Sequence, residues 1–232
     1  MKRHLLIIIC FLASAWVWAG ETDNDPYIHV DWSPLFSDNV GWNIGSGNFV
    51  LGWNNASGID AAMGRSIDIG WLSVIGAKYN TGHGQRLTMG LGIDWRNYRL
   101  GCSNQFIDEG DVLSIGSYPD GATSRLSRVK VFSLTVPLLF KQRLFDKVDI
   151  FAGPVLNFNV RASVLTQYKI GEEKIKLSRT GIHQVPVTVD IMGGIVWRGI
   201  GCYLRYSPCH VLKKQYAPCF TPLTVGLTLA VF

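Results

Sequence analysis

The sequence has few charged residues and, beyond its first residues, no long hydrophobic run. Asp, Glu, Lys and Arg together make up only 17% of the 232 residues, and like charges never gather in a block. A nucleic-acid-binding chain concentrates its basic residues, so nucleic acid is not indicated as a partner. After the first residues, no stretch reaches the roughly 20 apolar residues that a transmembrane helix needs. What remains has the length of one domain and is rich in Gly (25 residues) and in aromatic side chains (12%).

The sequence also lacks the motifs of metal and cofactor sites. No Cys/His spacing resembles a zinc site, and no Gly-rich segment follows a strand and opens a helix as a phosphate-binding loop does. A lipid-modifying enzyme would need a nucleophile and a base close together near the outer leaflet. The candidates for such a pair are Ser178, His183, Ser207 and His210, which form no recognised spacing. We therefore predict no cofactor, no metal and no enzymatic activity, with lipid modification or small-solute conduction as alternative functions.

The first residues are organised like a secretory signal peptide. Lys2 and Arg3 precede the apolar run Leu5–Leu12, and Val17 and Ala19 provide the small residues that signal peptidase requires. We expect residues 1–19 to be removed on export.

The domain organisation follows from the composition after this signal. Residues 20–39 are polar and without a period, and we interpret them as a periplasmic leader. Residues 40–232 then form one domain.

Alternation of apolar and polar side chains dominates this domain. It is clearest in residues 87–100, where Leu87, Ile93 and Trp95 share one face of an extended chain and Asp94 and Arg96 share the other, because successive strand residues point to opposite sides. The same period predicts seven further strands, near residues 40–45, 67–71, 125–141, 149–161, 185–197, 200–206 and 223–231.

The connections between these eight strands are alternately long and short. Transmembrane barrels have short periplasmic turns and longer outer loops, and an even strand number places both termini in the periplasm. A soluble lipocalin-like barrel is the alternative, but it needs no such asymmetry. We therefore predict an all-β, eight-stranded antiparallel transmembrane β-barrel of the cell outer membrane. The aromatic residues expected toward lipid near the interfaces are Trp42, Trp71, Trp95, Trp197 and Tyr206.

Three long segments lack a clear period, and we interpret residues 47–64, 102–124 and 167–179 as loops. Within strand 125–141 the apolar phase changes, because Val129 and Val131 lie on one phase and Phe132 begins the other. This change predicts a β-bulge near Val131.

Four strand motifs resemble the PorT-like outer-membrane β-barrel family of Bacteroidetes-type bacteria. They are Gly90–Leu100, Ser133–Phe140, Phe151–Phe158 and Pro222–Phe232. The resemblance implies a structural, binding or secretion-assembly role, with a secretion-system or surface protein as partner. As an outer-membrane barrel, the chain would also contact lipid and lipopolysaccharide, and the barrel-assembly machinery through its C-terminal strand. Phe232 departs from the pattern, since it is one residue out of phase with the apolar face of that strand.

The polar phase of the predicted strands carries acids and bases in nearly equal number. A narrow eight-stranded barrel is filled by its own side chains, and buried charges need partners, so we expect a salt-bridged plug in the lumen. An ion path or a catalytic cluster is the functional alternative. The predicted lumenal charges are Asp68, Asp94, Arg96, Arg128, Lys130, Asp149, Arg161, Asp190 and Arg205.

Four cysteines follow the signal. Cys209 and Cys219 lie at the two feet of one predicted outer loop, and we expect them to form a disulfide in an oxidising compartment. Cys102 is then a free thiol or a competitor for either partner. Cys202 is expected near a periplasmic turn, too far from the other three for a bridge.

Overall fold

A computed structural model describes residues 40–44, 47–57, 64–110 and 112–230. The predicted signal peptide 1–19, the leader 20–39 and Phe232 lie outside the described residues. In the part that the structure describes, no helix has the length and apolarity required to cross a bilayer. The described strands are β1 (Val40–Ile44), β2 (Asn48–Ser57), β3 (Ser66–Gly82), β4 (Gln85–Arg99), β5 (Asn104–Glu109), β6 (Val112–Ser117), β7 (Ala122–Phe145), β8 (Val148–Ile170), β9 (Glu173–Thr180), β10 (Val187–Trp197), β11 (Ile200–Tyr206) and β12 (Thr221–Ala230).

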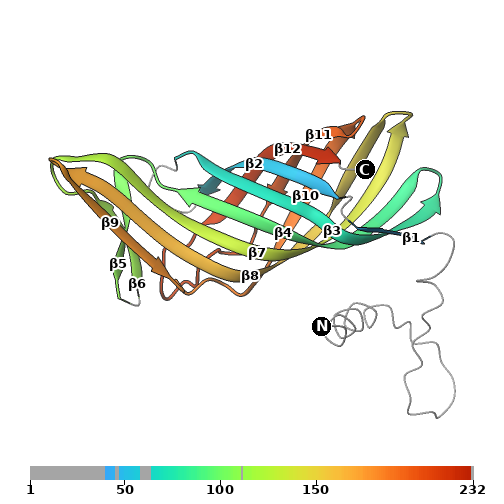
Figure 1. The fold of residues 1–232 in the computed structure, drawn as a ribbon. Helices are drawn as coiled ribbons and strands as arrows, with labels where there is room; N and C mark the ends of the chain where they lie inside the picture. Colours follow the sequence, from blue (N-terminus) through green and yellow to red (C-terminus); the bar gives the residue numbers. More distant parts are fainter. Residues whose placement is uncertain (1–39, 45–46, 58–63, 111, 231–232) are drawn as a thin grey trace, which may run out of the picture. The chain divides into compact units, whose positions relative to one another are not determined.

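Eight of these strands close into a barrel (Figure 1). Their order around the wall is β3-β2-β12-β11-β10-β8-β7-β4, and β4 pairs with β3 to complete the circle. The eight pairings are antiparallel. The predicted fold class, an all-β chain with an eight-stranded antiparallel barrel, is confirmed.

The two ends of the barrel differ in their connections. At one end, which we call the short-turn end, two-residue turns join β3 to β4, β7 to β8 and β10 to β11. In two of them both turn residues have positive φ: 51° and 75° at His83 and Gly84, 50° and 89° at Arg198 and Gly199. This is the backbone of the type I′ turn, whose twist matches that of the flanking strands. The other connections meet at the opposite, long-loop end.

The first barrel strand is β2, and the prediction placed it wrongly. Residues 47–64 were predicted to be a loop, yet Asn48–Ser57 pairs with β12 on one side and β3 on the other. The predicted strand near residues 40–45 corresponds to β1, which pairs with β3 alone. Glycine and asparagine in β2 suggested a loop, but Gly52 and Asn54 face the interior, where Val50 is also fully buried.

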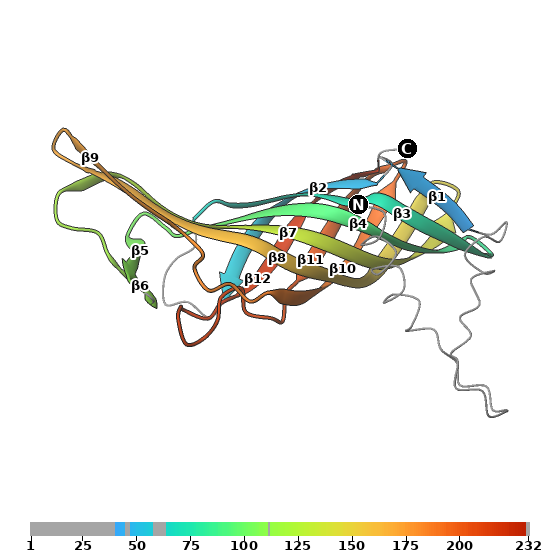
Figure 2. The same cartoon turned by 60° about the horizontal axis from the view of Figure 1, so that its bottom comes forward.

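The other two predicted loops also contain strands. Residues 102–124 include the β5–β6 hairpin, and residues 167–179 fall largely within the β8–β9 hairpin. Beyond Arg128, β7 pairs only with β8, and β8 continues to pair with β9. Figure 2 shows this ladder of β7, β8 and β9 running past the barrel, and we call it the arm.

No bulge occurs at Val131, contrary to the prediction. The β4–β7 register is continuous from Gly92↔Thr135 to Arg99↔Arg128. The bulge lies instead in β8, where Phe132 pairs with Arg161 and Ser133 with Asn159, so that Val160 is an extra residue. Val129 and Val131 keep the inward phase and are buried there.

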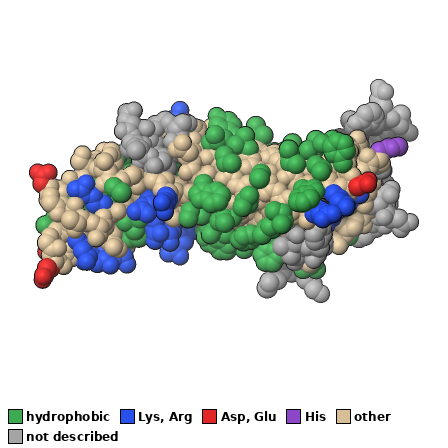
Figure 3. Space-filling view, turned by 90° about the horizontal axis from the view of Figure 1, so that it is seen from above, with side chains coloured by type: hydrophobic (Ala, Val, Ile, Leu, Met, Phe, Trp, Pro, Cys, Tyr) green, Lys and Arg blue, Asp and Glu red, His purple; other side chains and the backbone are tan. Residues whose placement is uncertain are grey.

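The outer wall of the barrel is apolar. Figure 3 shows hydrophobic side chains over the middle of the wall. Among the aromatic residues predicted to face lipid, Trp42, Trp95, Trp197 and Tyr206 are exposed and Trp71 is half-buried. Further exposed apolar residues on the wall include Trp53, Ile69, Leu134, Leu138, Phe140, Phe158, Ile191, Ile195, Leu204, Val225 and Leu227.

Candidate functional site: the sealed barrel interior

Five charged side chains meet in the middle of the barrel interior. Asp68 comes from β3, Asp94 and Arg96 from β4, Asp190 from β10 and Arg205 from β11. Each occupies an inward position of its strand, and none is more than 4% exposed. Asp68 and Arg96 are direct partners in the β3–β4 register, so pairing of the wall itself aligns them.

Arg205 is the centre of this ion network. Its Nε lies 2.7 Å from Asp190 Oδ2, its Nη2 2.9 Å from Asp94 Oδ2 and its Nη1 3.4 Å from Asp68 Oδ2. Arg96 adds two longer contacts, 3.6 Å from Nε to Asp94 Oδ2 and 3.7 Å from Nη1 to Asp190 Oδ2. The planar, many-donor guanidinium suits such a site, because one side chain can address three carboxylates.

Neutral side chains from β7 and β8 complete the network. Arg96 Nη2 donates to Ser133 Oγ at 2.9 Å and to Asn159 Oδ1 at 2.7 Å. Asn157 accepts from Arg205 Nη2 and donates to Asp190 Oδ2, both at 2.8 Å. Because the partners come from six strands, β3, β4, β7, β8, β10 and β11, the network ties opposite parts of the wall together.

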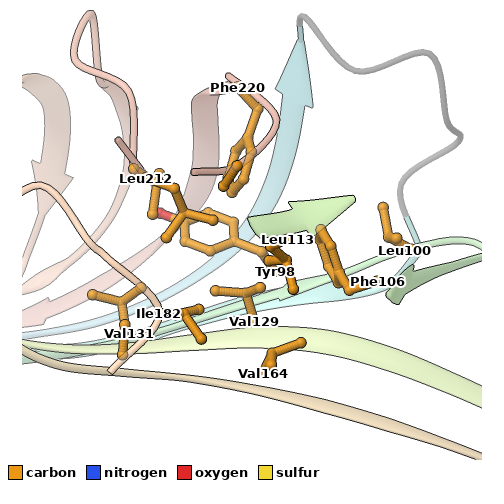
Figure 4. Close-up of a cluster of buried hydrophobic side chains, with 13 residues drawn as sticks. Tyr98, Leu100, Phe106, Leu113, Val129, Val131, Val164, Ile182, Leu212 and Phe220 are labelled. Carbon is orange, nitrogen blue, oxygen red and sulfur yellow. The ribbon is translucent and has the colours of Figure 1, made fainter. Parts of the chain in front are cut away.

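Two apolar clusters enclose the network. Toward the short-turn end, Val50, Phe151, Val155, Met192 and Tyr203 belong to one cluster of buried side chains. Toward the long-loop end lies a second cluster, which Figure 4 shows in close-up. Its members are Tyr98, Leu100, Phe106, Leu113, Val129, Val131, Ala162, Val164, Ile182, Val211, Leu212, Ala217 and Phe220. The lumen is therefore layered as apolar, ionic and apolar.

Segments from the long connections close the second cluster. Phe106 and Leu113 come from the β5–β6 hairpin, and Leu212 and Phe220 come from the connection between β11 and β12. Backbone hydrogen bonds join these segments: Leu113 N–H donates to the Tyr216 carbonyl at 2.7 Å, and Lys213 N–H to the His183 carbonyl at 3.0 Å. These hydrogen bonds join the segments over the second cluster, and we call the segments together the cap.

Four of the nine predicted lumenal charges do not join the network, and three of these, Arg128, Lys130 and Arg161, do not face the lumen, contrary to the prediction. Arg128 and Lys130 lie on the outward phase of β7, and Arg161 lies exposed beyond the β8 bulge. Asp149 has the predicted inward phase, since it pairs with buried Val196, but it lies outside the network at the short-turn end, where its Oδ1 lies 3.4 Å from Nε of Arg143. The misplaced bulge in β7 caused the first two errors, because a shift of one residue exchanges the faces of a strand.

The predicted Cys209–Cys219 disulfide is absent. Both side chains are half-buried free thiols, and Cys102 and Cys202 are exposed free thiols. Cys202 lies on the outer phase of β11 between Ile200 and Leu204.

Two of the four residues considered for catalysis make other side-chain contacts. The His183 ring stacks on Tyr216 with ring centroids 4.0 Å apart, and Ser207 Oγ donates to the Cys209 carbonyl. Within the described residues no hydrogen bond joins any two of Ser178, His183, Ser207 and His210. No group of metal-ligating side chains occurs there either.

Sequence reasoning missed a cavity on the outer wall at the base of the arm. Its volume is about 650 Å³, and its lining includes Arg99 and Arg125. Beside it, Tyr118 packs edge-on against Tyr168, and the Arg125 guanidinium lies 5.5 Å from the Tyr118 ring centroid. Burial raises the pKa of the Tyr118 phenol, so this ring stays neutral near the arginine. A smaller cavity of about 180 Å³ lies at the short-turn end, lined by Arg86 and Lys141 among others.

Comparison with known proteins gives no family assignment. No protein-family model and no curated protein matches the chain. Two similar solved structures are both of Ail, the attachment invasion locus protein of Yersinia pestis. One is 8% identical with a TM-score of 0.37 and covers 80% of this chain and 95% of that chain. The other, a complex with the heparin analogue sucrose octasulfate, is 11% identical with a TM-score of 0.35 and the same coverage.

Proposed function

We propose that the protein is an integral outer-membrane barrel with a sealed lumen, which acts through the surface at its long-loop end as a binding or assembly component. The observation that carries this proposal is the distribution of polarity. The wall is apolar outside, while the ion network lies inside between two apolar clusters. A soluble barrel would place these faces the other way round.

The difference in connection length between the two ends of the barrel supports one orientation of the barrel in the membrane. Bacterial outer-membrane barrels place short turns in the periplasm and longer loops outside. The long-loop end, with the arm and the β5–β6 hairpin, is then extracellular and available to a surface or secretion-system partner. The PorT-like motifs in Gly90–Leu100 and Pro222–Phe232 favour a secretion-assembly role within this proposal.

Membrane insertion is tested by gel mobility and extraction. Because the barrel is closed by hydrogen bonds around its full circumference, we expect the unboiled protein to migrate faster than the boiled protein in detergent gels. It should also stay in the membrane fraction after a carbonate wash. A protein with the same mobility in both states, removed by carbonate, would contradict the proposal.

The sealed lumen is tested by electrical recording. We expect wild-type protein in planar bilayers to show no steady conductance, because apolar side chains occlude both sides of the ion network. A porin reconstituted in the same way is the positive control. Large, stable openings of the wild-type protein would favour the channel alternative, whereas openings confined to Arg96→Ala would identify the network as part of the barrier.

A further inference from the structure

A group of basic side chains lies on the outside of the barrel wall. Arg99 is on β4, Arg128 and Lys130 are on β7, and Arg161 is on β8. Strand register brings them together, since Arg99 pairs directly with Arg128, and Phe132, the next outward residue after Lys130, pairs with Arg161. We call these four residues the cationic belt.

The belt begins where the apolar wall ends. On β7, Phe132 is the last outward apolar residue before Lys130 and Arg128, and its ring lies 5.0 Å from the ring of Trp95 on β4. From Phe132 to Phe140 the outward phase covers eight residue steps, about 26 Å of strand, or about 20 Å along the axis of a tilted barrel. This approaches the height of the apolar band in outer-membrane barrels, so the belt falls at the level of lipid headgroups.

The belt has no acidic partners within the described part of the chain. Ion pairs outside the lumen are present elsewhere, as between Arg179 and Asp108, but none there includes a belt residue. Nε of Arg128 is buried and has no hydrogen-bond acceptor. Like charges on paired strands repel one another, so this arrangement is unfavourable without an anion.

The outer cavity adjoins the belt through Arg99, which lines it. The other lining residues are Cys102, Thr123, Ser124, Arg125, Leu126 and Gln167. Arg125 is held there, because its Nε donates to the Ala122 carbonyl at 2.8 Å. The cavity has an open volume of about 650 Å³, and a guanidinium, hydroxyls and an amide line it. Such a site is suited to binding a phosphorylated sugar.

We propose that the belt and the outer cavity together bind the phosphorylated sugar headgroup of a glycolipid of the lipid A type in the outer leaflet. The proposal rests on the membrane insertion and orientation proposed above. Position identifies the source of the phosphate, because the belt continues the lipid-facing phase of three neighbouring strands. A free anion in solution would not require a site that continues the lipid-facing side of the wall. Arginine and lysine supply the charge-assisted hydrogen bonds that phosphate accepts.

The test measures binding of bis-phosphorylated lipid A to purified, folded protein in nanodiscs by native mass spectrometry. We expect wild-type protein to retain lipid A in preference to the same lipid without its phosphates, and inorganic phosphate in millimolar excess to leave the adduct in place. Loss of two belt charges in Arg99→Gln/Arg161→Gln should weaken retention by about tenfold or more. The single variant Arg161→Gln removes an exposed side chain and should give a smaller decrease.

The matched control is Lys174→Gln/Lys176→Gln on β9, which removes the same charge from exposed positions of the arm. It should bind lipid A like the wild type. Equal weakening by the control pair, or equal retention of dephosphorylated lipid A, would overturn the belt site. Displacement by inorganic phosphate would assign it to a free anion and overturn the lipid proposal. Each sample is checked for the heat-dependent gel shift, so a failure of the barrel itself is seen separately.

Discussion

Replacing Arg205 with alanine is expected to prevent or severely weaken folding of the barrel. The substitution leaves Asp68, Asp94 and Asp190 buried with Arg96 as the remaining cation of the network. Removing one partner of a buried ion pair typically costs about 3–5 kcal/mol, because the remaining charges stay desolvated. Urea titration of the liposome-inserted protein, followed by tryptophan fluorescence and by the gel shift, measures this loss.

Two further variants test whether the loss of stability is specific to the Arg205 guanidinium. Arg205→Lys retains the charge but cannot address three carboxylates with a planar fork, so we expect intermediate stability. Lys176→Ala removes a cation from an exposed position on β9 and should change stability by less than about 0.5 kcal/mol. Wild-type stability of Arg205→Ala would show that the network does not hold the barrel together.

Gly153→Ala is expected to have the second large effect, although alanine is ordinarily the better strand residue. A Cβ at Gly153 would lie 2.0 Å from the carbonyl oxygen of Leu138 on β7, and the obstacle is backbone. Overpacking of this kind costs about 3 kcal/mol when the wall cannot move apart. We expect a lower urea midpoint and less heat-shifted protein.

Gly193→Ala on the neighbouring strand β10 is the matched control. The nearest atom to a Cβ there is the Phe151 carbonyl oxygen at 3.4 Å, an ordinary contact. The control should retain wild-type stability. Equal midpoints for the two alanine variants would mean that β7 and β8 separate easily at Gly153, contrary to the close approach of their backbones.

The alternation of side chains was sufficient to predict the barrel and the centre of its lumen. Asp94 and Arg96 occupy the polar phase of β4, and their burial follows from closure of the wall. The partners of Arg205 were not predictable, because Asp68 lies 137 residues away in sequence and its contact depends on the barrel's diameter and register. Local pattern specifies which face a charge occupies, but it does not specify the opposite wall.

The error at Val131 has a physical cause, which is that β7 passes from the apolar outer wall of the barrel to the capped end. From Val131 toward the short-turn end, the outward phase of β7 is apolar, with Phe132 and Leu134, and the inward phase carries Ser133 and Thr135. From Val131 toward the long-loop end, the inward phase is apolar, because Val129 and Val131 pack in the cluster that the cap covers. The outward phase there carries Arg128 and Lys130. The polarity of the two faces is exchanged without any change of register. A sequence pattern cannot distinguish this exchange from a bulge.

Closure of the barrel between β2 and β12 also determines when the protein can assemble. These are the first and last strands of the closed circle, so their pairing needs the entire barrel segment to have been synthesised. The network spans the same separation, since Asp68 and Asp94 belong to the early strands and Asp190 and Arg205 to the late ones. A sheet that lacks the late strands therefore contains Asp68 and Asp94 without the Arg205 guanidinium that contacts both of them in the complete barrel. A partly assembled barrel is therefore electrostatically unfavourable, and the last two strands, β11 and β12, supply Arg205 and close the circumference.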